Sequence, residues 1–361
     1  MGPVVIVGCG MTTPIGLTAP ETAASARSRT ARLTEIEWRD SRYKGYVVGI
    51  VPDDCLPQLH PDLESQPLSF RESRMLRLAD SALQEALAPL PKSVRSVPLL
   101  LGMPELHTTV PIEPKQFLSR LAKQSKATLD LSRSRSLPQG RAAGLLAVKD
   151  AAESLAKGKE LFVLAGGVDS YVDLYVLGTL DMQKRVRTDV NPDGFTPGEG
   201  AGFVLMTTES VARQHKLETL ARIVACSASR EEGHIYSDKP YRGDGLAGAF
   251  ESLFALASGS KPAACVYASF NGEHYWAREF GVAVVRHKKH FAQDYQTEHP
   301  AECFGDIGAA HGPVMLGLAC LGMKDGYRPS PTIVYSSSDF GDRAAVLVAK
   351  NEPESASPQR R

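Results

Sequence analysis

The sequence predicts a layered α/β fold built from two successive halves. Short apolar segments typical of buried strands alternate with longer segments whose apolar residues recur at helical spacing. This alternation runs from Val4 to about residue 215 and starts again at Ala221. Near the middle, a glycine-rich loop from Asp193 to Gly202 lies between two apolar segments. Strands that alternate with helices in this way form sheets that are covered by helices.

Composition limits the function classes. The chain has 361 residues, 43% of them apolar and 23% charged, and its net charge is zero, which does not favour nucleic acid or an anionic membrane as a partner. The basic run at 286–290 is predicted to be a solvated face. No apolar run approaches the ~18 residues that a membrane span needs, and the chain starts with a strand instead of a leader, so we expect a cytoplasmic protein. Six scattered cysteines without CxxC spacing predict no zinc site, no disulfide framework and no metal or cofactor.

The first half is predicted to hold the elements in a regular order. They are a strand at 4–7, a helix near 20–28, irregular connections to 65, a helix at 70–87, a strand at 97–101 and an unassigned segment at 112–139, of which the part from Leu129 to Gly140 is polar and interrupted. Gly8 and Gly10 lack the third glycine of a dinucleotide-binding loop. The next helix runs from Arg141 to Lys157 with Gly158 as its C-terminal cap.

The second half follows a central stretch of strand, glycine loop and strand. The four glycines and one proline of the loop are predicted to exclude a helix or a strand there. The later elements are a helix at 210–217, a strand at 221–226, a helix at 245–257, a strand at 264–268, a helix at 274–279, a strand at 282–285, a Gly/Ala-rich turn at 305–312, a helix at 313–323, strands near 332 and 343, and a disordered tail at 351–361.

The glycine loop, at this distance after the strand that ends in Ala165-Gly-Gly167, resembles the β-ketoacyl synthases of the thiolase superfamily. Counted back from Gly167 without a gap, the helix from Arg141 to Gly158 matches the nucleophile helix of that family in length and glycine positions. The resemblance implies a thiolase-like fold with two duplicated βαβαβαββ halves, at 1–215 and 216–350, in a layered α/β/α/β/α structure. It also implies a structural loop and gate formed by Gly194, Gly198, Glu199, Gly200, Gly202, Phe340 and Gly341.

The same resemblance implies that the catalytic groups are missing. The family uses a cysteine at the helix N-terminus and two histidines, and the matching positions here hold Arg141, Asn271 and Asp306, with Gly305 as an alternative to Asp306. An arginine cannot form a thioester. The threonines that hold the carrier protein's phosphopantetheine arm correspond to Glu273 and Tyr275, so the resemblance does not support an acyl carrier protein as a partner.

The charged residues at these positions suggest a hypothesis about how the site is neutralised. A cation at a helix N-terminus faces the positive end of the helix dipole. We expect Arg141 to form a pocket ion pair with Asp306, or with Glu273 or Glu302, whose loops converge there in the family. The alternative is an anionic ligand on Arg141. Two residues outside these positions, Cys303 and His311, are the candidates for a relocated cysteine–histidine pair.

Three functional hypotheses follow. The first is a non-catalytic partner subunit or scaffold, because the family includes chain-length-factor subunits that lack the cysteine; related bacterial proteins occur near type VI secretion genes in association with effector loading. The second is an acyltransferase with an altered active site, and the third is a sensor that binds an acyl or anionic ligand. The resemblance implies a homodimer, or a heterodimer with another ketosynthase-like subunit, with a protein cargo as a further partner. The unusual segment at 125–140 weakens that expectation.

Overall fold

The computed structural model describes residues 2–106 and 111–351. The predicted tail therefore lies, apart from residue 351, outside the described residues. Ten strands of the described chain form one sheet in the order β10-β9-β11-β12-β8-β1-β7-β6-β4-β5. Their bounds are β1 Val4–Thr12, β4 Leu99–Gly102, β5 Arg135–Leu137, β6 Phe162–Ser170, β7 Glu199–Thr208, β8 Ala221–Arg230, β9 Ala263–Tyr267, β10 Phe291–Glu298, β11 Thr332–Ser337 and β12 Asp342–Ala349.

The strand order repeats itself about the central β1–β8 pair. Outward from β1 come β7, β6, β4 and β5, and outward from β8 come β12, β11, β9 and β10. In both directions the first two pairings are antiparallel and the last two are parallel. The strands within 4–208 thus form one half of the sheet and those within 221–349 form the other. This repeated order is the duplication that the sequence does not show as a repeat.

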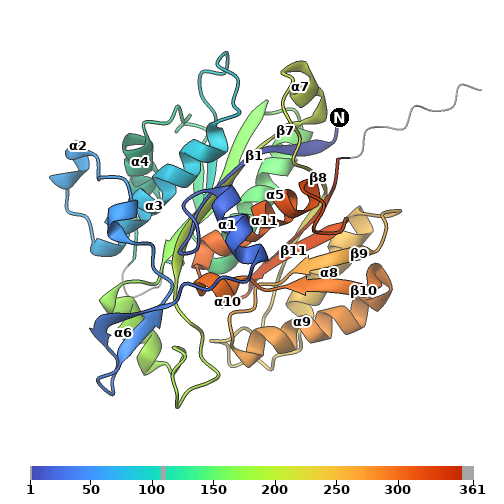
Figure 1. Ribbon diagram of the computed structural model, residues 1–361. Coiled ribbons are helices and arrows are strands. Elements are labelled where there is room, and N and C mark those ends of the chain that lie inside the picture. The colour runs from blue at the N-terminus through green and yellow to red at the C-terminus, as the bar shows by residue number, and fades with distance from the viewer. Residues whose placement is uncertain (1, 107–110, 352–361) are drawn as a thin grey trace, which may run out of the picture.

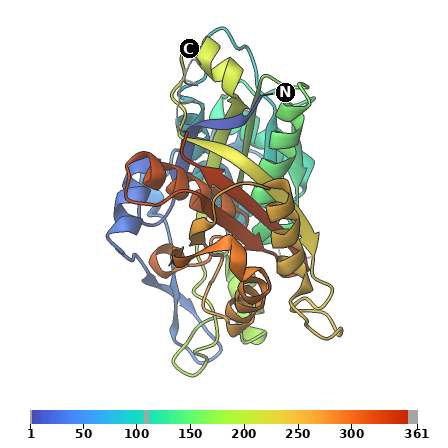
Figure 2. The same ribbon diagram turned by 90° about the vertical axis from the view of Figure 1, so that its right-hand side faces the viewer.

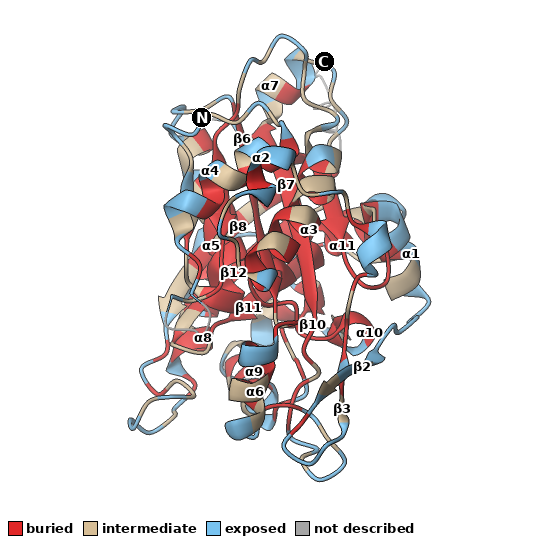
Figure 3. Ribbon diagram, turned by 90° about the vertical axis from the view of Figure 1, so that its left-hand side faces the viewer, coloured by how far each residue is buried: buried red, intermediate tan, exposed pale blue. Residues whose placement is uncertain are grey.

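The helices form three layers around the two halves of the sheet (Figures 1 and 2). In the middle lie α5 (Ala143–Ala156) and α11 (His311–Lys324), which pack against strands of both halves. The outer face of the first half is covered by α3 (Phe70–Leu87), and that of the second by α8 (Asp244–Leu256) and α9 (His274–His287). Buried residues gather in the strands and the middle helices, whereas the outer helices carry the exposed ones (Figure 3).

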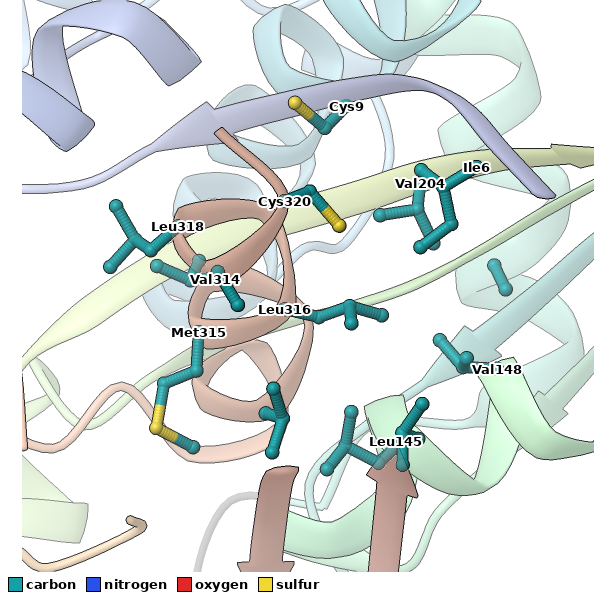
Figure 4. Close-up of a cluster of buried hydrophobic side chains, with 14 of the residues drawn as sticks. Ile6, Cys9, Leu145, Val148, Val204, Val314, Met315, Leu316, Leu318 and Cys320 are labelled. Carbon is teal, nitrogen blue, oxygen red and sulfur yellow. The ribbon is translucent and has the colours of Figure 1, made fainter. Parts of the chain in front are cut away.

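The middle helices are apolar on most sides, and this explains their position. A helix that is apolar all round is buried by packing on more than one side. Leu145 and Val148 of α5, Leu316 of α11, and Ile6 and Val204 of the sheet gather in one cluster (Figure 4). All five are less than 2% exposed. The N-terminal end of each middle helix, called its head below, therefore lies deep between the two halves of the sheet.

The remaining elements are shorter. They are α1 Ala19–Arg27, the antiparallel hairpin β2 Thr34–Arg39 and β3 Gly45–Val48, α2 Pro61–Glu64, α4 Pro114–Ser125, α6 Leu174–Met182, α7 Glu209–Gln214 and α10 Ala301–Phe304. Among the described residues, no helix is both long enough and apolar enough to cross a bilayer.

Several predicted elements are wrong. Residues 282–285 continue α9 and do not form a strand, because Trp276, Phe280 and Ala283 are buried at helical spacing and override the strand preference of the valines. The segment at 112–139 holds α4 and the short edge strand β5. The irregular connections to residue 65 contain the hairpin β2–β3, and β10 was not foreseen at all.

The glycine loop also differs from its prediction. Strand β7 already begins at Glu199 and includes Gly200 and Gly202, which were assigned to the loop. Glycine is required there because other parts of the chain come close: a Cβ on Gly202 would lie 2.7 Å from Val314 Cγ2. Gly198, just before the strand, would meet the carbonyl oxygen of Phe304 at 2.4 Å. The close approach of α10 and α11, and not a loop, explains these glycines.

Candidate functional site

Arg141 occupies a tight turn at the head of α5. The turn Gly140–Ala142 begins with Gly140 at a φ of +63°, a conformation that favours glycine. Two serines fix the turn to the second half of the sheet: Ser336 Oγ donates a hydrogen bond of 2.8 Å to the Arg141 carbonyl, and Ala142 N donates one of 2.8 Å to Ser338 Oγ. The Arg141 side chain is 2% exposed. The first turn of this helix head is thus occupied by a buried guanidinium.

The guanidinium of Arg141 contacts three groups. Its Nε lies 3.1 Å from Asp306 Oδ2, its Nη2 donates a hydrogen bond to the Ser269 carbonyl, and its Cζ lies 4.7 Å from the ring centre of Trp276. Burial opposes the charge, but Asp306 and Asp339 raise the pKa of Arg141 above its usual range. Arg141 therefore stays charged at every physiological pH.

Asp306 is held in place as the counter-ion. Its Oδ2 accepts a hydrogen bond of 2.9 Å from Asn271 Nδ2, and its Oδ1 accepts one of 3.0 Å from Gly308 N. Nδ1 of His311 lies 3.7 Å from Oδ1. Burial acts to raise the pKa of Asp306, but Arg141, His311 and Asn271 together hold it well below its usual range. Asn271 and Asp306 thus contact each other directly, and Arg141 pairs with Asp306.

Of the three acids expected near Arg141, only Asp306 pairs with it. Glu273 instead accepts two hydrogen bonds of 2.8 Å from Arg185, through Nε and Nη2. It also accepts from Trp276 Nε1 at 2.9 Å. Glu302 lies at the surface, where its Oε2 is 3.4 Å from His299 Nδ1. The loops converge as expected, but the side chains of Glu273 and Glu302 turn to other partners.

Cys303 and His311 do not form a pair. Cys303 is buried in α10, where burial and Glu302 raise the pKa of its thiol to about 11. The described contacts include no hydrogen bond between the Cys303 thiol and His311, and neither ring nitrogen of His311 has a hydrogen-bond partner among the described residues. Burial lowers the pKa of His311. A thiol in this state is a poor nucleophile.

The structural glutamate and the gate lie where the strands end. Glu199 is fully buried; it accepts two hydrogen bonds from Arg74, at 2.6 and 2.7 Å, and one from Val51 N at 2.9 Å. Phe340 and Gly341 form the turn between β11 and β12, with Gly341 at a φ of +107°. Gly194 would meet the backbone of Val186 within 2.5 Å if it carried a Cβ, and Gly200 would come 3.0 Å from the Thr12 carbonyl oxygen.

Three contributors were missed from the sequence. Arg185 and Asp339 stand in no periodic pattern, and the helical spacing of Trp276 indicates burial but no role at the site. One signal was present: Glu273 and Asp306 bring two carboxylates to the site, more charge than Arg141 alone can neutralise, so a second buried cation was required. Arg185 is that cation. Among the described residues, no group of three or more His, Cys, Asp or Glu side chains could hold a metal ion.

Comparison with known proteins supports the fold. The family "Beta-ketoacyl synthase, N-terminal domain" matches residues 140–212, which start at the Arg141 turn. A chain of a type II polyketide synthase complex, in which an acyl-carrier protein is bound to its ketosynthase, superposes with a TM-score of 0.77 at 16% identity, covering 97% of this chain and 99% of that one. The chain has a ketosynthase fold. No curated protein matches the sequence significantly.

Two further ketosynthase structures show the same fold. The ishigamide ketosynthase/chain length factor gives a TM-score of 0.78 at 15% identity over 97% of this chain and 100% of that chain. A ketosynthase domain of oxazolomycin synthesis from Streptomyces albus gives 0.80 at 15% over 98% of this chain and 76% of that one. The ketosynthase fold predicted from the glycine loop and the central helix is confirmed. The expectation that an acyl carrier protein is not a partner gains no support, since one matched structure contains such a carrier.

Proposed function

We propose that the chain is a non-catalytic ketosynthase-fold subunit that acts by binding a partner. One observation carries the proposal: the head of the central helix presents the buried guanidinium of Arg141, neutralised by Asp306 at 3.1 Å. Thioester chemistry needs an accessible thiolate at that point. The guanidinium has no nucleophilic lone pair available and stays protonated.

The surroundings support the same conclusion. Asn271, at the position of the first histidine, is used as a donor to Asp306 and Glu273 and has no second role left for its amide nitrogen. Asp306, at the second, is the counter-ion of Arg141. A charge pair with nearly complete burial is costly to open, because either partner alone would be an uncompensated buried charge. The site is built to stay closed and not to turn over.

The partner is proposed to be a second ketosynthase-fold chain, either another copy or an active synthase, as in the ketosynthase/chain length factor pair among the matched structures. The sheet edge of the first half is β5, which has three residues and carries the exposed Arg135 in an ion pair with Asp150. Short, charged edge strands resist pairing with a strand of another chain. We therefore expect side-chain packing, more than sheet extension, to hold the partner.

The absence of turnover is tested by intact-mass analysis after incubation with acyl-CoA and with an acylated carrier protein. We expect no covalent adduct on the purified chain. Arg141→Cys is the matched variant, since it returns a thiol to the helix head without altering another position. An adduct on the natural chain that disappears in Cys303→Ala would overturn the proposal in favour of an acyltransferase with a relocated nucleophile.

Partner binding is tested by sedimentation velocity, with the chain alone and mixed with a ketosynthase encoded beside it, together with a pull-down from the native cell. We expect a two-chain complex in one of these mixtures. A scaffold for a protein cargo, including effector loading in type VI secretion, is the same proposal with another partner, and the pull-down separates the two. A chain that stays monomeric at high micromolar concentration and captures no protein would contradict a binding role.

A further inference from the structure

The basic run at 286–290 is only in part the solvated face that the sequence predicts. Arg286 donates a hydrogen bond of 2.8 Å to a carboxylate at the start of α8, and His287 Nε2 lies 2.9 Å from a backbone carbonyl oxygen of the same helix. His290 stacks on Phe254 of α8, with ring centres 4.2 Å apart and an angle of 7° between the rings. These contacts fix both ends of the run along α8, so the backbone of the two lysines between them is held in place.

A cavity of about 190 Å³ lies at the end of this run. It is bounded by the last turn of α8, the loop that follows this helix, the start of β9, and His290. Its volume is that of roughly six water molecules and lies below the range of about 300–1,000 Å³ that is usual for drug-sized ligands. None of its lining residues belongs to the site around Arg141. A ligand in this cavity is therefore small and separate from that site.

The inner wall of the cavity is apolar. Phe254 and Ala257 line it from the C-terminal end of α8, and Leu347 lines it from β12. Ala257 is 8% exposed and Leu347 is 2% exposed, so both are parts of the core that end at the cavity. The imidazole of His290, stacked on Phe254, adds a flat surface. This wall suits a flat or apolar ligand body.

The outer wall is cationic. Lys261, from the loop after α8, and Lys289, from the basic run, line the same cavity. Within the described parts of the chain, no carboxylate lies within ion-pair distance of either ammonium group, whereas Arg286 has one. Burial, Lys289 and His287 lower the pKa of His290, so the titratable neighbours that act on it are both basic. Like charges that converge on one cavity repel each other, and an oxyanion between them would relieve that repulsion.

Two serine hydroxyl groups add neutral donors. Ser258 and Ser260 line the cavity from a tight turn, in which Ser260 N donates to the Ala257 carbonyl at 2.9 Å and Gly259 has a φ of +84°. Each ammonium group has three donors and each hydroxyl has one. A phosphate ester offers three strong acceptor oxygens, one more than a carboxylate, and so uses more of these donors.

We propose that this cavity is a binding site for a small organic phosphate. The phosphate group lies between Lys261 and Lys289, within reach of the serine hydroxyls. The apolar body packs against Phe254 and Leu347. The small volume excludes a nucleotide or a long acyl chain. The site lies on the outer face of the second half, so it does not depend on the proposed function.

The ligand class is tested by titration calorimetry with phenyl phosphate at low ionic strength. Inorganic phosphate and benzoate are the matched probes, because the first lacks the apolar body and the second lacks the phosphate group. We expect phenyl phosphate to bind about tenfold more tightly than either, since only phenyl phosphate uses both walls. Equal affinity for phenyl phosphate and inorganic phosphate, or no binding of phenyl phosphate, would overturn the site.

The two lysines are tested with Lys261→Met and Lys289→Met. Each variant removes one charged donor, so we expect phenyl phosphate to bind about tenfold more weakly to each. Lys288→Met is the matched control: Lys288 belongs to the same run and is exposed, but it does not line the cavity. Its loss should change the affinity by less than about twofold, because exposed charges are screened. Equal weakening in all three variants would indicate a diffuse basic surface and overturn the site.

Two further outcomes would also contradict the proposal. If the lysines only complement the carbonyl end of α8, both variants would lower the unfolding free energy and leave phenyl phosphate binding unchanged. If the ligand is a lipid headgroup, the chain would float with phosphatidate-containing vesicles and Lys289→Met would abolish this; we expect no flotation. These measurements involve neither thioester formation nor a partner chain, so failure here and failure of the proposed function are distinguishable.

Discussion

The heads of the two middle helices are built alike but carry opposite charges. Both α5 and α11 have 14 residues and follow a three-residue turn that starts with glycine at positive φ, +63° for Gly140 and +55° for Gly308. Each head is capped by a side chain of the opposite half: Ser338 accepts from Ala142 N at 2.8 Å, and Asp169 accepts from Ala309 N at 3.1 Å. The duplication thus extends to the caps.

The difference lies in how charge is balanced. At the head of α11 the cap is an anion, Asp169, which the helix dipole favours and which Arg71 of α3 neutralises at 2.9 Å within the same half. At the head of α5 the cap is a neutral hydroxyl, and the cation Arg141 opposes the dipole. Its counter-ion, Asp306, comes from the other half. The charge of Arg141 therefore contributes to the contact between the two halves.

The largest expected effect comes from removing the Arg141 charge. Arg141→Met keeps most of the side-chain volume but leaves Asp306 buried without a counter-ion, so we expect the free energy of unfolding to fall by about 3–5 kcal/mol. Adding Asp306→Asn should restore more than half of that loss. Urea denaturation of the single and double variants measures both. A loss below about 1 kcal/mol in Arg141→Met would mean that Asp306 is balanced by other groups.

Most of the fold was predictable because regular patterns encode it. Helix α3 was predicted with the observed bounds, 70–87, from apolar residues at helical spacing and the proline that follows. The head of α5 was located from the resemblance of its length and glycine positions to the nucleophile helix of the ketosynthase family. Where the prediction failed, tertiary packing decided: valines 282, 284 and 285 favour a strand locally, yet the buried face of α9 requires a helix. The pairing of β2 with β3 has no local signal of comparable strength.

The site was predictable in its residue types and less so in its partners. The pairing of Arg141 with a nearby acid was expected from its charge and from loops that the family resemblance brings together. The choice of Asp306 over Glu273 depended on Arg185, a residue without a motif. A sequence shows which charges are present on converging loops. It does not show how several cations divide the carboxylates among them, because that division depends on rotamers and on distances of an ångström.

Acid should lower the stability of the region around the two helix heads by protonating Asp306. Its pKa in the folded state lies below that of an unfolded aspartate, about 3.9. Its stabilising contribution is thus complete above that value and is lost as the pH falls toward the folded pKa. Below about pH 4, the unfolding free energy of the natural chain should fall more steeply than that of Asp306→Asn, as measured by denaturation at several pH values. Parallel curves would show that Asp306 has the same pKa in both states.

Two glycines, one in each middle helix, allow the packing around the two helix heads to be compared. A Cβ on Gly144 of α5 would meet Pro313 Cγ at 2.3 Å and the Ala309 carbonyl oxygen at 2.6 Å, whereas one on Gly312 of α11 would meet Leu145 Cγ at 2.6 Å. Backbone and a proline ring cannot move aside, but a leucine can change rotamer. We expect Gly144→Ala to cost about 1–3 kcal/mol and Gly312→Ala to cost less, as measured by thermal and urea unfolding. The reverse order would place the rigid contact at α11.

The smallest effect concerns the neutral cap. Ser338→Ala leaves the Ala142 N–H at the head of α5 without its acceptor, which should cost about 1 kcal/mol, as for other helix caps. Because the amide lies between the two halves, the loss should also accelerate its hydrogen exchange, whereas the Ala309 amide, capped by Asp169, should keep its rate. Equal acceleration of both amides would show that the two heads open together. The different charges at the two heads would then not affect how each head opens, and the two halves would behave as one cooperative unit.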